Sequence, residues 1–253
     1  AADDEAMPEP ARRAARRLLT AKVDAVVGHF NSDAAAAAGP LYRAAGVPLL
    51  LPAATRDGLA REIGALRLCP TDADQVAALA ESLAERLAAA GPAVLAADAT
   101  PYAARLVAAL GAHPALAGGP PPALVSLGDS DLAGAPPGAA VAFLGTHPAI
   151  LGALARWSRT GALDGRRLLA CDDCSLPAFA QALPPGVRIA VATPRPSFAE
   201  AVREAIGLVV RHAGSPGGLA AALAADPLFV DGERRGAAFD LVATTLPGSR
   251  PRA

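Results

Sequence analysis

Short apolar runs alternate with longer amphipathic segments along most of the chain. The apolar runs have the length of buried strands, and each amphipathic segment is long enough to cross back over a sheet. This alternation is typical of parallel sheets with crossover helices, so it predicts an α/β fold. The predicted strands are 23–27, 47–51, 93–97, 123–127, 140–144, 167–170, 187–191 and 237–245, and the predicted helices are 9–20, 33–45, 72–90, 101–110, 148–159, 176–183 and 198–212.

Hydroxyl side chains mark several of the predicted helix starts. Thr71, Thr100, Ser175 and Ser197 each precede a helical segment, where a side-chain oxygen can accept a backbone N–H. Near the C-terminal end, two glycine-containing stretches interrupt the alternation before the final predicted strand.

The composition argues against several classes of partner. The 23 basic and 24 acidic residues leave a net charge of −1, which does not suit nucleic acid. No apolar stretch reaches the roughly 20 residues that a membrane helix needs. The acidic residues 1–5 lack the basic and apolar regions of a signal peptide.

No catalytic or nucleotide-binding motif is present. The chain contains neither a G-x-G-x-x-G nor a G-x-x-x-x-G-K-[ST] phosphate loop, and no G-x-S-x-G elbow. Cys171-Asp172-Asp173-Cys174 is a C-x-x-C, which suits a redox pair or half a metal site. A second ligand pair is missing and the four histidines lie far apart, so a small loop with two thiols or one local disulfide is the favoured interpretation. We therefore predict no metal and no cofactor.

Polar residues follow the predicted strands, where open parallel sheets bind ligands. Residues 28–33 and 52–55 offer hydroxyls and backbone N–H groups suited to a carboxylate. Residues 98–102, 145–147 and 172–173 instead offer an aromatic ring and anions. An α-amino acid needs both chemistries. The alternative is that these residues are ordinary helix caps and turn residues.

Three stretches of the sequence resemble the type I periplasmic binding proteins, specifically the receptors for leucine, isoleucine and valine. The first is Asp3-Asp4, an Arg-rich helix to Thr20, and then Val26-Val27-Gly28-His29. The second runs from Gly46-Val47-Pro48 to Pro52-Ala53-Ala54-Thr55. The third, Leu68-Cys69-Pro70-Thr71-Asp72, is similar to the first crossing between that family's lobes.

This resemblance implies two doubly wound parallel-sheet lobes, joined by hinge strands and closing on a ligand between them. Lobe 1 would comprise residues 1–69 and 194–226, and lobe 2 residues 70–193 and 227–253. The β-α-β unit that opens the family's first lobe is absent from this sequence, so lobe 1 is expected to be incomplete. Either the sequence is truncated, or another chain covers the open sheet edge, as in a homodimer.

The family's ligand contacts can be carried over residue by residue. Those that would take a ligand carboxylate fall on Asn31, Ser32, Ala54 and Thr55. Those that would bind an ammonium group fall on Tyr102, on Thr146 or His147, and on Asp172.

The resemblance implies a periplasmic solute-binding protein of an ABC transporter, which captures a small amino acid of the branched-chain type or a related carboxylate and docks on a membrane permease. Such a protein is not an enzyme. Three alternatives are open: a ligand-sensing regulatory module, a truncated remnant that binds nothing, and an enzyme using Asp172, Asp173 or His147 as acid and base.

Overall fold

The computed structural model describes residues 1–90, 93–130, 132 and 135–245. The chain divides into two compact units. Unit 1 comprises Ala1–Asp72 and Pro194–Ala238, and unit 2 comprises Ala73–Thr193 and Phe239–Ala253, of which residues 246–253 lie outside the described part. The chain therefore passes from one unit to the other three times.

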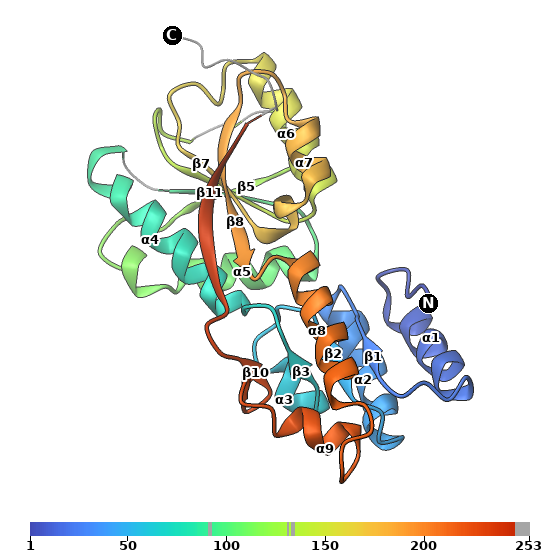
Figure 1. Cartoon of the computed structure of the whole chain (residues 1–253). Helices are drawn as coiled ribbons and strands as arrows, with labels where there is room; N and C mark the ends of the chain where they lie inside the picture. The colour runs from blue at the N-terminus through green and yellow to red at the C-terminus, as the bar shows by residue number, and fades with distance from the viewer. Residues whose placement is uncertain (91–92, 131, 133–134, 246–253) are drawn as a thin grey trace. The chain divides into compact units, whose positions relative to one another are not determined.

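Unit 1 is built on a five-stranded sheet (Figure 1). Its strand order is β1 (Val26–Val27), β2 (Leu49–Leu51), β3 (Leu66–Arg67), β10 (Glu233–Arg234) and β9 (Phe229–Val230). The first four strands are parallel and β9 is antiparallel. The helices are α1 (Pro8–Thr20), α2 (Ser32–Ala44), α3 (Leu59–Ile63), α8 (Phe198–His212) and α9 (Leu219–Ala224).

Successive side chains of β2 enter different cores, as expected for a strand buried on both faces. Leu49 and Leu51 pack with buried residues of α1, α2 and α3. Leu50 packs with buried residues of α8 and α9. Helices thus cover both faces of this sheet, which is what the continuous apolar run of β2 requires.

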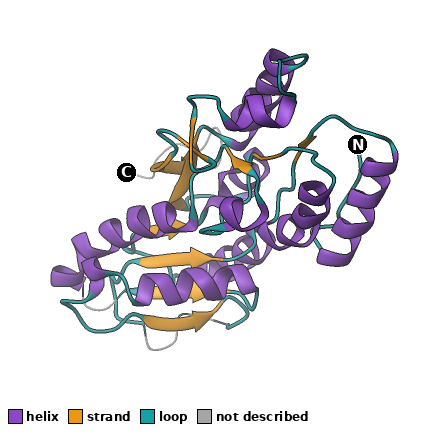
Figure 2. Ribbon diagram, turned by 90° about the horizontal axis from the view of Figure 1, so that it is seen from below, coloured by secondary structure: helices purple, strands orange, loops and turns teal. Residues whose placement is uncertain are grey.

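Unit 2 is built on a six-stranded sheet with helices on both sides (Figures 1 and 2). Its strand order is β11 (Ala238–Thr245), β8 (Arg188–Arg195), β7 (Leu168–Ala170), β6 (Val141–Leu144), β4 (Val94–Ala97) and β5 (Ala123–Ser126). The helices are α4 (Asp72–Ala90), α5 (Pro101–Gly111), α6 (His147–Arg159) and α7 (Pro177–Ala182), with the 3₁₀ turns η1 (Pro114–Leu116) and η2 (Asp172–Ser175).

The order of strands reverses between β4 and β6 in unit 2. These two strands pair in parallel, with Val94 opposite Val141 and Ala97 opposite Leu144. From β4 the chain goes outward to β5, whereas from β6 it goes the opposite way to β7 and β8. The loops after β4 and β6 therefore lie at a topological switch point, where open α/β sheets bind their ligands.

The predicted α/β class is confirmed, with two sheets that are mainly parallel. Helices α4 and α8 begin and end at the predicted residues. The side chain of Thr100 caps α5, and Ser197 forms a capping box with Glu200 at α8. The predicted cap at Ser175 is wrong, because residues 172–175 form η2 and α7 begins later, after Leu176.

Residues 227–238 differ from the predicted division of the chain. They were expected in lobe 2, but the structure groups them with unit 1. The reason is that β10 pairs with β3, with Glu233 opposite Arg67, and carries β9 with it. Among the described residues, no helix has both the length and the apolarity needed to cross a membrane.

Candidate functional site

Asp172 and Tyr102, both predicted ligand residues, are in contact in unit 2. Asp172 lies two residues beyond the carboxyl-terminal end of β7 and is only 5% exposed. The Tyr102 hydroxyl, from the first turn of α5, donates a hydrogen bond to Asp172 Oδ1. The structure thus places a phenol beside a buried carboxylate, an arrangement that can present acceptor oxygens to a cation.

Gln75 completes this cluster and was not predicted. Its Oε1 accepts a hydrogen bond from the Asp172 backbone N–H at 2.9 Å, and its Nε2 donates to the Tyr102 hydroxyl at 3.2 Å. Gln75 is fully buried in α4. Gln75 lies one helical turn before Leu79, on the apolar face of α4. A polar residue on the buried face of a helix needs a hydrogen-bond partner, and this signal could have identified Gln75 from the sequence.

The predicted residue Thr146 lies at the switch point, tied to Asp98. Asp98 Oδ2 accepts hydrogen bonds from the Thr146 backbone N–H at 2.8 Å and from its hydroxyl at 3.2 Å. Asp98 Oδ1 accepts from the Thr100 backbone N–H at 3.0 Å. A single carboxylate therefore joins the loops after β4 and β6, and Thr146 itself is exposed.

The predicted residue His147 begins α6 and pairs with Asp173. Asp173 Oδ2 accepts from the His147 backbone N–H at 2.6 Å and lies 2.9 Å from Nδ1. The carboxylate also complements the positive end of the α6 dipole. The half-buried ring is thereby held in one orientation.

In unit 1, the predicted residues Asn31 and Ser32 stand at the amino-terminal end of α2. Asn31 is exposed and occupies the N-cap position, where its carbonyl accepts the Ala35 N–H at 2.9 Å. The Ser32 Oγ accepts the Arg56 backbone N–H at 3.1 Å. This bond joins the loops after β1 and β2, the two segments expected to take a carboxylate.

Ala54 and Thr55 are buried, which limits what they can offer a ligand. The methyl group of Ala54 packs in the core, and its carbonyl accepts from Arg67 Nη1 at 3.1 Å. The Thr55 carbonyl accepts from the Asp72 N–H at 2.8 Å. Ala54 can therefore act only through its backbone, and both residues are fixed by neighbouring segments.

Arg67, which was not predicted, anchors this loop from β3. Its guanidinium is fully buried and makes a two-pronged ion pair with Glu233, with Nε–Oε2 and Nη2–Oε1 both 2.7 Å. Its Nη1 also donates to the Arg56 carbonyl at 2.6 Å. Burial lowers the pKa of Arg67, but the hydrogen bonds and charge of Glu233 outweigh it, so the pKa is raised overall. Arg67 is therefore a fixed positive charge beneath the loop.

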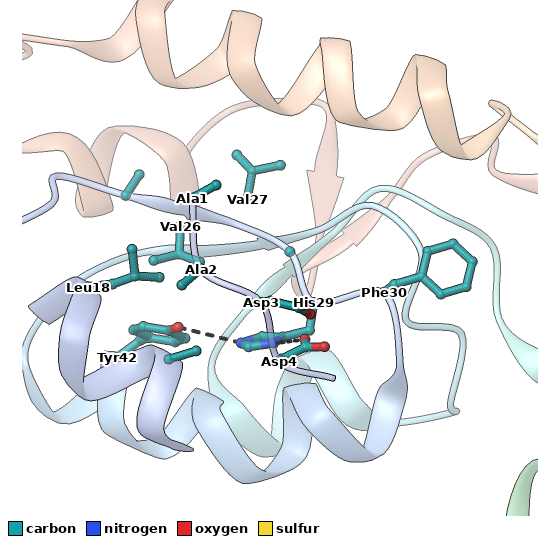
Figure 3. Close-up of a pocket in the computed structure, with 13 residues that line it drawn as sticks. Ala1, Ala2, Asp3, Asp4, Leu18, Val26, Val27, His29, Phe30 and Tyr42 are labelled. Carbon is teal, nitrogen blue, oxygen red and sulfur yellow. Dashed lines mark hydrogen bonds and ion pairs between the residues drawn. The ribbon is translucent and has the colours of Figure 1, made fainter. Parts of the chain in front are cut away.

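A separate pocket of about 380 Å³ lies along β1, between the N-terminal residues and α1 (Figure 3). His29 links Asp4 to Tyr42 there: its Nδ1 pairs with Asp4 Oδ2 and its Nε2 lies 3.5 Å from the Tyr42 hydroxyl. Burial and then the Asp4 charge raise the pKa of Tyr42 to about 12. None of the eight predicted ligand residues lines this pocket.

A family model described as periplasmic binding protein matches residues 1–139, more than half of the chain. The chain belongs to the periplasmic binding protein family. In this family member, the acidic pair and the V-V-G-H strand end that carried the resemblance touch each other through Asp4 and His29. A comparison with curated protein sequences finds no match.

Solved structures of this family share the fold. The substrate-binding protein LivJ from Streptococcus pneumoniae, in complex with isoleucine, superimposes with a TM-score of 0.73 at 19% identity, covering 95% of this chain and 86% of its own. The leucine-binding protein LivK from Thermotoga maritima gives 0.73 at 17% identity, covering 96% and 86%. A solute-binding protein from Rhodopseudomonas palustris, in complex with 4-hydroxybenzoate, gives 0.65 at 16% identity, covering 87% and 71%. The predicted type I periplasmic-binding-protein fold is confirmed.

Proposed function

We propose that this periplasmic binding protein captures a small amino acid of the branched-chain type, or a related carboxylate, for an ABC transporter. The observation that carries the proposal is the cluster of Gln75, Tyr102 and Asp172 beyond the carboxyl-terminal end of β7. A buried carboxylate braced by an amide and a phenol suits an ammonium group, because it accepts charged hydrogen bonds without having to reorganise.

The predicted ligand residues of each unit suit one group of such a ligand. In unit 1, the exposed Asn31, the Ser32 hydroxyl and the amino-terminal end of α2 suit a carboxylate, since the backbone N–H groups at a helix start and the helix dipole favour negative charge there. In unit 2, Asp172 would bind the ammonium group. Thr146 and His147 lie at the same end of the sheet.

The ligand class is supported by relatives of the same fold. LivJ is described with isoleucine, and a substrate-binding protein from Desulfitobacterium hafniense is described with leucine. The Rhodopseudomonas palustris protein holds an aromatic acid instead. All three ligands carry a carboxylate, and two carry an ammonium group. A permease partner and a periplasmic location follow from the proposed transport role.

Ligand binding is tested first by thermal shift and isothermal titration with leucine, isoleucine, valine and 4-hydroxybenzoate. A ligand at a hundred times its Kd should raise the free energy of unfolding by about 2.7 kcal/mol. We expect the aliphatic amino acids to do so. If only 4-hydroxybenzoate binds, the ligand is an aromatic acid, and if no member of the panel binds, the proposal fails.

The role of Asp172 is tested by pairing a variant with matched ligands. Asp172→Asn removes the charge, so we expect leucine affinity to fall by about tenfold or more, the effect of one charged hydrogen bond. Affinity for 4-methylpentanoate, which is leucine without its ammonium group, should be unchanged. Asp164→Asn, an exposed carboxylate before β7, is the control. Equal losses for both ligands would contradict the assignment of the ammonium group to Asp172.

A further inference from the structure

The two cysteines of the C-x-x-C enclose the proposed ammonium-binding residue. Cys171 follows β7, Cys174 lies within η2, and both are buried free thiols. The Cys174 backbone N–H donates to the Cys171 carbonyl at 3.1 Å, closing an i to i+3 turn. Such a turn holds its end Cα atoms within about 7 Å, and a disulfide spans about 4.4–6.8 Å. The backbone is therefore already suited to a bond between the two sulfurs.

The sulfur of Cys171 also contacts the loop after β6. Its thiol donates to the Gly145 carbonyl at 3.2 Å and accepts from the Gly145 N–H at 3.4 Å. Gly145 immediately precedes Thr146 and His147. The oxidation state of this sulfur therefore bears on two of the loops that carry predicted ligand residues.

The chemistry of the pair favours a lasting disulfide over a catalytic dithiol. Burial raises the pKa of the Cys174 thiol, and its hydrogen bond with Cys171 and the charges of Asp173 and Asp172 raise it further. Catalytic C-x-x-C pairs have a stabilised thiolate, which makes their disulfides easy to reduce. Here the thiolate is disfavoured. Within the described residues, no group of three or more Cys, His, Asp or Glu side chains could hold a metal ion.

We propose that a disulfide joins Cys171 and Cys174 in the working form of the protein and fixes the loop that carries Asp172. Two S–H bonds break and one S–S bond forms. The two electrons and two protons pass to a disulfide oxidant, such as oxidised glutathione, which becomes two thiols. Because both sulfurs are buried, the exchange takes place while the loop is open, as during folding in an oxidising compartment.

The bond is tested by refolding the full chain with oxidised or with reduced glutathione. We expect the oxidised protein to lose the mass of two hydrogen atoms and, once denatured, to label at one thiol instead of three. Peptide mapping should place the bond between Cys171 and Cys174. Cys69→Ser should lose the same mass and label at no thiol instead of two, whereas Cys171→Ser with Cys174→Ser should lose no mass. Three reactive thiols after oxidation, or a bond to Cys69, would overturn the proposal.

The effect on Asp172 is measured by hydrogen exchange of its backbone N–H, which is bonded to Gln75. Closing the four-residue loop should slow this exchange by about tenfold, and a reductant should restore it. Equal exchange in both forms would overturn the fixing of the loop. Tighter leucine binding by the oxidised form is also expected, and this last step rests on the proposed function. If neither form binds leucine, the proposed function fails, while the thiol count and the exchange rate still decide the inference.

Discussion

At the scale of single residues, Arg67 shows how a buried charge supports the predicted carboxylate site. It has no exposed surface, and its partner Glu233 is about one-third exposed. Arg67→Met would leave Glu233 and the carbonyls of Ala54 and Arg56 without their donor. We expect the free energy of unfolding to fall by about 3 kcal/mol. This loss is at the low end of those caused by removing one partner of a buried ion pair, because water reaches Glu233 and solvates its charge.

Urea denaturation of the Arg67 variant measures this loss. Arg167→Met is the matched control, because Arg167 is about one-third exposed and its partner Glu85 is 62% exposed. That change should cost less than about 1 kcal/mol. Similar small losses in both variants would show that Arg67 does not anchor the loop.

Tyr42 makes a second residue-scale prediction, for alkaline pH. Its pKa is raised to about 12 in the folded protein by burial and by Asp4, against 10.0 as the ordinary value. Between these pH values the folded state retains a proton that the unfolded state has lost, so stability must fall as pH rises. The loss should reach up to about 3 kcal/mol by pH 12. Tyr42→Phe should lose less stability than the native chain over this range, and equal losses would contradict the assignment.

At the scale of elements, Gly145 allows the loops after β4 and β6 to meet. Its φ is +143°, and an added Cβ would lie 2.4 Å from Asp98 Cγ and Oδ2. Gly145→Ala should therefore lower the free energy of unfolding by about 2–4 kcal/mol, through backbone strain and this clash. Adding Asp98→Ala removes the clashing carboxylate, so the double variant should lose less than the sum of the single losses. Denaturation of all four proteins measures this coupling, which strict additivity would disprove.

The elements that the sequence could predict are those with a long, regular pattern. The 19-residue α4 and the 15-residue α8 were predicted to the residue, because apolar spacing and caps agree over several turns. The strands β3, β9 and β10 have two residues each and were missed, since such runs have no measurable period. For the same reason residues 227–238 were predicted in lobe 2, although β10 pairs with β3.

At the scale of the whole molecule, the sequence could predict the candidate-site residues that follow strand ends. It could not predict the residues that reach the site only through contacts with partners far away in the sequence. Asp172 and Tyr102 follow predicted strands, and the sequence therefore predicted both. Gln75 meets Asp172 across 97 positions, and Arg67 meets Glu233 across 166. No local pattern encodes such pairings, which arise only when the crossover connections bring the elements together.

The proposed ligand residues include residues of unit 1 and residues of unit 2, and hydrogen exchange can follow each set separately. Leucine should then slow hydrogen exchange in both: at the start of α2 in unit 1 and around η2 in unit 2. Asp172→Asn alters only unit 2, yet it should weaken the leucine-induced protection at Ser32 as strongly as that at Cys174, because a ligand that dissociates releases both ends. Protection at Ser32 that persists in this variant, at the same leucine concentration, would mean that unit 1 binds the ligand alone.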